Sequence, residues 1–215
     1  CGKDQAEAEL RCKQFIKERG YVDVSPFDDP YVISGQGTIG LELLAQRPDI
    51  KSILIPLSGG GLAAGVALAV KQKHPDIKIY GITMENGAAM HLSIKRGRPV
   101  EVIESPSLAD ALGGGIGLKN RYTFALCKKF LDDTFTVTES EIYRAMQTLY
   151  FEDRIIAEGS CVVGIAALLG KKIPKLIGPV ATIITGRNVN MSMFTAVING
   201  EDIKLGDIIL KGQPY

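Results

Sequence analysis

Apolar runs and amphipathic segments follow one another along this chain. The apolar runs predict buried strands, which span residues 21–24, 52–57, 77–83, 134–137 and 180–185. Segments in which apolar residues recur every three or four positions predict helices, which span residues 4–20, 34–44, 62–73, 87–96, 121–131, 138–152, 159–169 and 189–198. Because helices separate strands that are mostly apolar throughout, we expect an α/β fold. It would have a doubly wound, mostly parallel sheet with helices on both faces.

The most informative stretch follows the apolar run at residues 52–57. Ser58-Gly59-Gly60-Gly61-Leu62 lies between that predicted strand and the next predicted helix. Consecutive glycines leave main-chain N–H groups bare, and the positive end of the helix dipole adds to them. This glycine loop is therefore predicted to bind an anion, most often a phosphate. Ligands of parallel sheets lie at the carboxyl ends of strands, so residues 185–188 are expected to face the same crevice.

Local sequence leaves other interpretations of the glycine loop open. A P-loop would need Lys and then Ser or Thr after its last glycine, and Leu62 stands there instead. The pattern Gly59-x-Gly61-x-x-Ala64, with Glu85 near the end of the next strand, fits a relaxed dinucleotide-binding fingerprint. A third interpretation is a turn whose glycines only let a helix pack closely on a sheet.

Composition narrows the class of protein. With 46% hydrophobic and 23% charged residues, the 215-residue chain is typical of a soluble globular protein. A net charge of +1 without a run of Lys or Arg argues against a nucleic-acid partner. No apolar run reaches the roughly 18 residues of a membrane span, and a cytoplasmic location is expected. With only two histidines, the sequence argues against a Ser-His-Asp or zinc-hydrolase mechanism. The cysteines lack C-x-x-C spacing and are predicted to be mostly buried thiols: Cys1, Cys12, Cys127 and Cys161.

Several further stretches form a pattern with the glycine loop. They are Pro26-Phe27-Asp28-Asp29-Pro30, Gly35-Gln36-Gly37-Thr38-Ile39-Gly40-Leu41-Glu42, Glu158-Gly159-Ser160 and Thr185-Gly186-Arg187-Asn188-Val189. In this order and at this spacing they resemble the fold-type II pyridoxal-phosphate enzymes, specifically the threonine dehydratase and serine racemase group. The resemblance covers nearly the whole chain. It implies the large domain of such an enzyme and favours pyridoxal 5'-phosphate over a dinucleotide.

One branch of that group is closer than the rest. The stretch Leu108-Ala109-Asp110-Ala111-Leu112-Gly113-Gly114-Gly115-Ile116-Gly117, followed by Asn120-Arg121-Tyr122-Thr123-Phe124, resembles the hydroxyectoine-utilisation dehydratases. So does Gly186-Arg187-Asn188, where the commoner pattern of the group has Ser-Gly-Gly-Asn.

The resemblance implies roles for particular positions. Ser58, Gly59, Gly60, Gly61 and Leu62 would bind the cofactor phosphate through their main-chain N–H groups. Thr185 matches the serine that contacts the pyridine nitrogen. Without the resemblance, Thr185 would be interpreted as an ordinary β-branched residue of a strand. Glu158 matches an acid near the cofactor, and it would also suit the start of a helix.

Departures from the family pattern are equally informative. The family's Schiff-base lysine lies in a Ser-Phe-Lys-x-Arg-Gly type motif that is absent here, and Lys17 is expected to be solvated on an amphipathic helix. No catalytic residue is therefore assigned, and the lysine is expected upstream of Cys1. We expect a C-terminal portion of a protein of roughly 320 residues. Residues 1–24 would be a remnant of the smaller domain with its connecting helix, and residues 25–215 the large domain.

A divalent-cation site of some relatives is not expected here. The matching positions hold Thr83, Gly87 and Ala89, so two carboxylates are lost, and a hard cation needs several oxygen ligands.

The resemblance implies a pyridoxal-phosphate-dependent dehydratase or ammonia-lyase. It would convert a β-hydroxy amino acid to a 2-oxo acid and ammonia, and the fragment alone would be inactive. The alternatives are an amino-acid racemase of the same family, a NAD-binding Rossmann-type module, or a binding module without catalysis. Expected partners are a small amino-acid substrate and, in the intact protein, a second copy in a homodimer.

Overall fold

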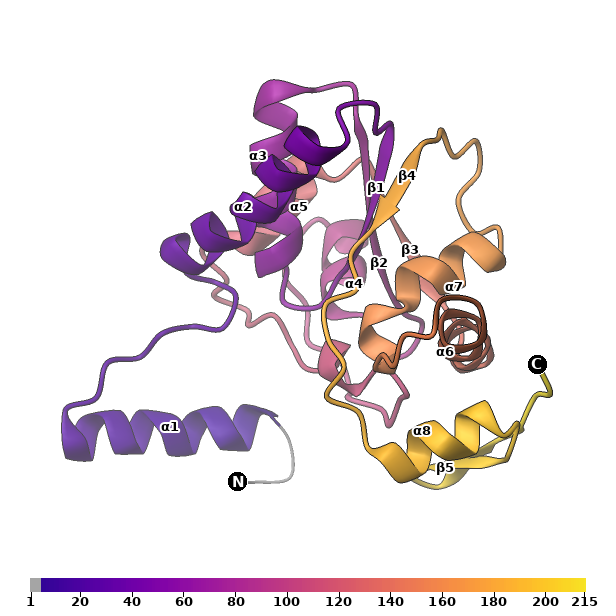
Figure 1. Ribbon diagram of the computed structural model, residues 1–215. Helices are drawn as coiled ribbons and strands as arrows, with labels where there is room; N and C mark the ends of the chain where they lie inside the picture. Colours follow the sequence, from indigo (N-terminus) through magenta and orange to yellow (C-terminus); the bar gives the residue numbers. More distant parts are fainter. Residues whose placement is uncertain (1–4) are drawn as a thin grey trace.

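A four-stranded sheet forms the centre of the molecule (Figure 1). The computed structural model describes residues 5–215. The sheet has the order β3-β2-β1-β4 and all of its pairs are parallel, which confirms the expected α/β fold. Its strands are β1 Ser52–Pro56, β2 Lys78–Met84, β3 Asp133–Val137 and β4 Val180–Thr182. A separate antiparallel hairpin pairs β5 Ile203–Leu205 with β6 Ile208–Leu210.

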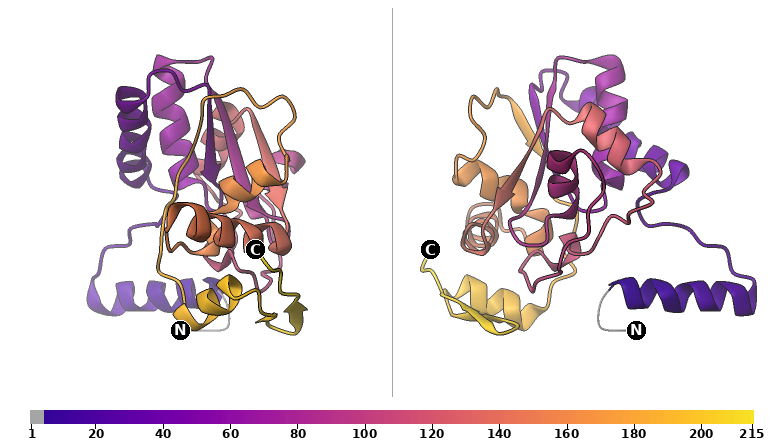
Figure 2. Two further views of the ribbon diagram at one scale, coloured as in Figure 1. Left: turned by 45° about the vertical axis from the view of Figure 1, so that its right-hand side comes forward. Right: turned by 180° about the vertical axis from the view of Figure 1, so that it is seen from behind.

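Helices cover both faces of the sheet (Figures 1 and 2). The helices of the α/β body are α2 Pro30–Gln46, α3 Gly61–Lys73, α4 Ala89–Arg96, α5 Thr123–Phe130, α6 Glu139–Asp153, α7 Val163–Leu169 and α8 Met191–Ile198. A further helix, α1 Gln5–Arg19, lies away from the sheet (Figure 1). Successive strand side chains point to opposite faces, so Ile53 and Ile55 of β1 join the core formed with α2, α3 and α5. Leu54 joins the core formed with α6, α7 and α8. The continuous apolar strands are thus explained by burial on both sides.

The starts of two helices show how side chains set their bounds. At α6, Thr138 and Glu141 form the predicted capping box, in which each side chain accepts a hydrogen bond from the other residue's N–H. At α2 the predicted start near residue 34 is wrong, because the helix begins at Pro30. Asp29 caps it by accepting from the N–H groups of Tyr31 and Val32, and proline is well tolerated at the first helical position.

Two predicted strands differ from the structure. Residues 21–24 form no strand, because this exposed segment has no neighbouring strand to pair with. The predicted buried strand at residues 180–185 ends at Thr182 and is only half-buried. The physical reason is that β4 lies at the edge of the sheet and pairs only with β1.

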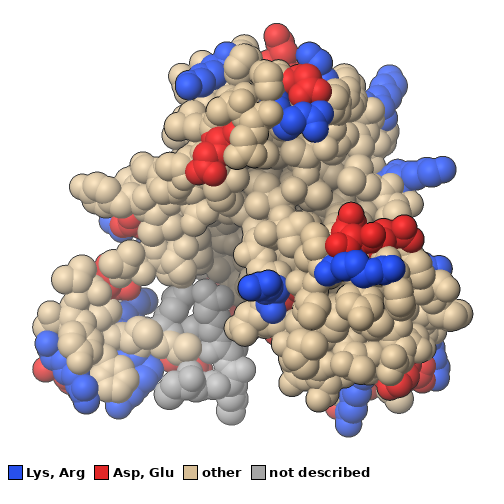
Figure 3. Space-filling view, viewed as in Figure 1, with Lys and Arg blue, Asp and Glu red and all other residues tan. Residues whose placement is uncertain are grey.

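α1 stands apart from the α/β body, and residues 20–24 lead from it to the rest of the chain (Figure 1). Lys17 is exposed on this helix. Cys127 and Cys161 are buried, whereas Cys12 on α1 is exposed and Cys1 lies outside the described residues. Within residues 5–215 no helix is both long and apolar enough to cross a membrane. Positive and negative side chains are spread over the face seen in Figure 3.

Candidate functional site

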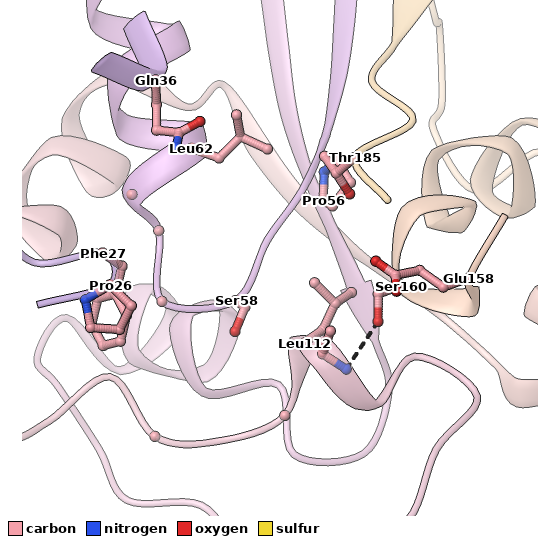
Figure 4. Close-up of a pocket in the computed structure, with 16 residues that line it drawn as sticks. Pro26, Phe27, Gln36, Pro56, Ser58, Leu62, Leu112, Glu158, Ser160 and Thr185 are labelled. Atoms are coloured by element: carbon pink, nitrogen blue, oxygen red, sulfur yellow. Dashed lines mark hydrogen bonds between the residues drawn. The ribbon is translucent and has the colours of Figure 1, made fainter. Parts of the chain in front are cut away.

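A pocket of about 350 Å³ opens beyond the carboxyl ends of β1 and β4 (Figure 4). This volume lies within the range of small-molecule sites. Adjacent parallel strands place the residues that follow them side by side, so the glycine loop after β1 and Thr185 after β4 both contribute. The lining residues are Pro26, Phe27, Gln36, Pro56, Ser58, Gly59, Gly60, Gly61, Leu62, Ala111, Leu112, Gly113, Gly115, Glu158, Ser160 and Thr185.

The glycine loop presents hydrogen-bond donors to this pocket. Gly60 caps α3 in the left-handed conformation, with φ 91°. The first N–H groups of a helix have no acceptor within the helix, and no acceptor for the N–H groups of residues 58–62 exists among the described residues. The positive end of the α3 dipole lies at the same place. The loop can therefore hold an anion through main-chain groups alone.

The same glycines also allow close packing behind the loop. A Cβ at Gly59 would overlap the Phe27 ring, and a Cβ at Gly61 would lie 2.9 Å from Phe27 Cα. At Gly60 it would lie 2.7 Å from Met90 Cε. These glycines therefore have a packing role beside their bare N–H groups, although their partners Phe27 and Met90 are not residues of the sheet, as the packing interpretation from the sequence assumed.

The opposite wall carries a hydroxyl and a carboxylate. Thr185 and Glu158 face the glycine loop across the pocket (Figure 4). Glu158 donates its N–H to Gly186 O at 3.3 Å, and a Cβ at Gly186 would overlap the Glu158 carboxylate. Glycine at position 186 thus leaves room for that carboxylate. Cys161 Sγ donates to Gly186 O at 3.0 Å, and burial raises the pKa of its thiol, which keeps the proton in place.

The floor of the pocket comes from the glycine-rich loop at residues 104–117, which contains the short 3-10 helix Asp110–Leu112. Ser160 Oγ accepts a hydrogen bond of 3.0 Å from the Ala111 N–H (Figure 4). Further back, the Glu139 carboxylate accepts from Ser107 Oγ at 2.5 Å and from the Leu108 N–H at 2.8 Å. This loop is thus tied to η2 (Gly159–Cys161) and to the start of α6.

Phe27, Gln36 and Ser160 are among the lining residues to which the sequence assigned no role in the site. All three lie in stretches that carried the family resemblance, which is the only sequence signal that marks them. The acid of the dinucleotide interpretation, Glu85, is exposed after β2 and does not line this pocket.

The pocket fits pyridoxal phosphate in part. Bare N–H groups suit its phosphate, and the Thr185 hydroxyl suits its pyridine nitrogen. No Lys or Arg is among the described residues that line the pocket, so the lysine that the cofactor needs is not supplied here. Within residues 5–215 no group of three or more His, Cys, Asp or Glu could hold a metal ion.

Comparison with known proteins identifies the family. Residues 1–186 match the family model described as pyridoxal-phosphate dependent enzyme. A Sinorhizobium fredii protein, provisionally named threonine dehydratase, is 47% identical over 199 residues, which cover 93% of this chain and 60% of that protein. The processed threonine deaminase isoform 2 of Solanum lycopersicum has a TM-score of 0.82 at 35% identity and covers 93% of this chain. Maize serine racemase has a TM-score of 0.82 at 31% identity and covers 91% of this chain.

The chain spans only part of these relatives: 58% of the Solanum lycopersicum structure and 60% of the maize structure. The matches nevertheless cover the sheet, the glycine loop and Thr185. The chain belongs to the family of pyridoxal-phosphate-dependent enzymes.

Proposed function

We propose that this chain is the phosphate-binding part of a pyridoxal-phosphate-dependent lyase. The intact enzyme removes the amino group and a β-hydroxyl from a small amino acid, giving a 2-oxo acid and ammonia. The observation that carries this proposal is a pocket lined both by Thr185 and by residues 58–62, whose N–H groups have no acceptor among the described residues. Two similar proteins bear the names threonine dehydratase and threonine deaminase.

Each wall of the pocket has a proposed task. The N–H groups from Ser58 to Leu62 hold the phosphate, and the α3 dipole offsets its negative charge. The Thr185 hydroxyl contacts the pyridine nitrogen, and it does not hold a proton there as a carboxylate would. When bound, pyridoxal phosphate withdraws electrons from the substrate carbon that loses its proton. A neutral partner at Thr185 weakens that withdrawal and so favours elimination of a β-group over transamination.

A lysine outside these residues completes the proposed site. The pocket offers no lysine of its own among the described residues, and Lys17 lies exposed on α1. In this proposal residues 25–215 are the large domain, residues 1–24 belong to the smaller domain, and the lysine precedes Cys1. It takes the α-proton from the substrate.

Finer assignments belong to the same proposal. The loop at residues 108–117 and the Gly186-Arg187-Asn188 stretch support the hydroxyectoine-utilisation branch. We further propose a cytoplasmic homodimer as the form of the intact enzyme. Amino-acid racemisation is the alternative activity, and the likeness to maize serine racemase favours it. Incubation of the intact protein with β-hydroxy amino acids separates the two, because elimination releases ammonia and racemisation only inverts the substrate.

Ligand binding tests the phosphate site in the chain itself. Pyridoxine 5'-phosphate is a suitable probe because it has no aldehyde and cannot react with surface lysines. In equilibrium dialysis we expect it to bind more tightly than pyridoxine, and inorganic phosphate to compete. NAD serves as the control ligand. Binding of NAD without binding of pyridoxine phosphate would show that the phosphate site of this proposal is wrong.

A further inference from the structure

Two separate segments support the glycine loop from behind. Phe27, in the segment that leads into α2, contacts Gly59 and Gly61 so closely that neither position has room for a Cβ. On α5, Thr123 and Cys127 approach Gly60, where a Cβ would lie 3.2 Å from Thr123 Cβ and 3.0 Å from Cys127 Sγ. The conformation of the loop therefore depends on how these two supports are held.

Cys127 adds a polar contact to the second support. Its Sγ donates to Gly60 O at 3.6 Å. Burial raises the pKa of this thiol to about 12, so the thiol keeps its proton at neutral pH and remains a donor. The carbonyl of Gly60 also accepts from the Ala64 N–H at 2.8 Å, as the first bond of α3.

A single carboxylate joins the two supports. Asp28 follows Phe27 directly, and it accepts hydrogen bonds from the N–H groups of Arg121 at 2.6 Å, Tyr122 at 2.8 Å and Thr123 at 2.9 Å. These donors are the start of α5, which has no side-chain cap from Tyr122. A carboxylate at a helix start is bound by charge-assisted hydrogen bonds and by the helix dipole. Ser25 Oγ accepts from the Asp28 N–H at 3.0 Å and holds the carboxylate in place from its own side.

We infer that Asp28 is a positioning residue for the phosphate loop. Its carboxylate locks Phe27 and the start of α5 together, and the two then hold Gly59, Gly60 and Gly61 in the shape that presents their N–H groups. This inference rests on the proposed phosphate site. A preorganised loop binds more tightly because it loses less freedom when the ligand arrives. Loss of the Asp28 carboxylate should therefore weaken binding of a phosphorylated ligand specifically.

The test compares two ligands and four variants of the full chain. The ratio of the pyridoxine Kd to the pyridoxine 5'-phosphate Kd measures the contribution of the phosphate. Asp28→Ala removes all three hydrogen bonds and Asp28→Asn keeps one oxygen acceptor, while Phe27→Leu shrinks the first support directly. Asp29→Ala is the matched control, because the Asp29 carboxylate in the same segment accepts its hydrogen bonds from the start of α2 and not from α5.

We expect Asp28→Ala to lower the ratio about tenfold, which corresponds to about 1.4 kcal/mol. Asp28→Asn and Phe27→Leu should lower it less, and Asp29→Ala should leave it unchanged. If Asp28→Ala does not fold, as judged by circular dichroism, the milder two variants decide. The inference is wrong if the folded Asp28 and Phe27 variants keep the wild-type ratio. It is also wrong if Asp29→Ala lowers the ratio as much as they do. A wild-type chain that binds both ligands alike overturns the proposed phosphate site itself.

Discussion

At the scale of single residues, Gly60 combines several demands at one position. Its φ of 91° lies in the left-handed region, which favours glycine. Its missing Cβ makes room for Met90 and Cys127, and its carbonyl accepts from two donors. The sequence motif indicates the bare N–H groups but not the partners against which Gly60 packs. The packing demand comes from residues far away in the chain, and only the folded structure reveals it.

Substitution of Gly60 separates the dihedral cost from the packing cost. Gly97, the C-cap of α4, has φ 74°, and a Cβ there would meet only Lys128 Nζ at 3.7 Å. Gly97→Ala should therefore lower the free energy of unfolding by about 1–2 kcal/mol, the cost of the left-handed region. Gly60→Ala should cost clearly more, about 3 kcal/mol or above, because a Cβ collides with buried side chains. Urea unfolding measures both, and equal losses would contradict the packing argument.

At the scale of elements, Asp132 connects β3 with the neighbouring strand β2 and with helix α3. It lies just before β3 and accepts from Lys71 of α3 at 2.7 Å and from Lys78 of β2 at 2.8 Å. The Ile79 N–H donates to it at 2.9 Å. Burial alone would raise the pKa of this carboxyl, but the hydrogen bonds from the two lysines and from Ile79 outweigh it. The net pKa lies below the ordinary value of 3.8.

This shift predicts how stability depends on pH. A carboxyl whose pKa is lower in the folded state stabilises the protein above its unfolded pKa, and this contribution is lost as pH falls through the folded pKa. Asp132→Asn should therefore lower the free energy of unfolding at neutral pH and flatten its decline below the ordinary pKa of 3.8. Asp49→Asn is the control, since the Arg47–Asp49 pair is exposed and exposed pairs contribute little. Identical acid profiles for wild type and Asp132→Asn would contradict the prediction.

At the scale of the whole molecule, the chain divides into α1 and the α/β body. The connecting segment is exposed, with Tyr21, Val22 and Val24 at 57%, 87% and 63% of full exposure. The α/β body begins after this segment, where Asp28 accepts a hydrogen bond from the start of α5 and Asp29 caps α2. The boundary at residue 24 stays a proposal.

Limited digestion with trypsin should cut after Arg19 before it cuts the body, because exposed segments with few contacts are the preferred sites of cleavage. The product from Gly20 onward should keep the midpoint of thermal unfolding of the full chain, since α1 lies outside both cores. Mass spectrometry identifies the product and circular dichroism follows its unfolding. A clear fall of that midpoint would mean that α1 contributes to the stability of the body.

Much of the fold could be predicted from the sequence, because its signals are local. Continuous apolar runs indicate strands buried on two faces, and Thr138 with Glu141 marks the start of α6. The glycine loop before α3 likewise indicates an anion site from its own residues. The strand predicted at residues 21–24 failed because pairing needs a partner, which local apolarity does not provide.

The sequence by itself thus determined the α/β class, the order of most elements and the place of the glycine loop. Tertiary structure alone decided that β4 is an edge strand, that Phe27 packs behind the glycines, and that Asp28 binds α5. The physical reason is separation along the chain. Asp28 and its three donors are 93 to 95 positions apart, so their hydrogen bonds leave no periodic or motif signal and form only when the chain folds.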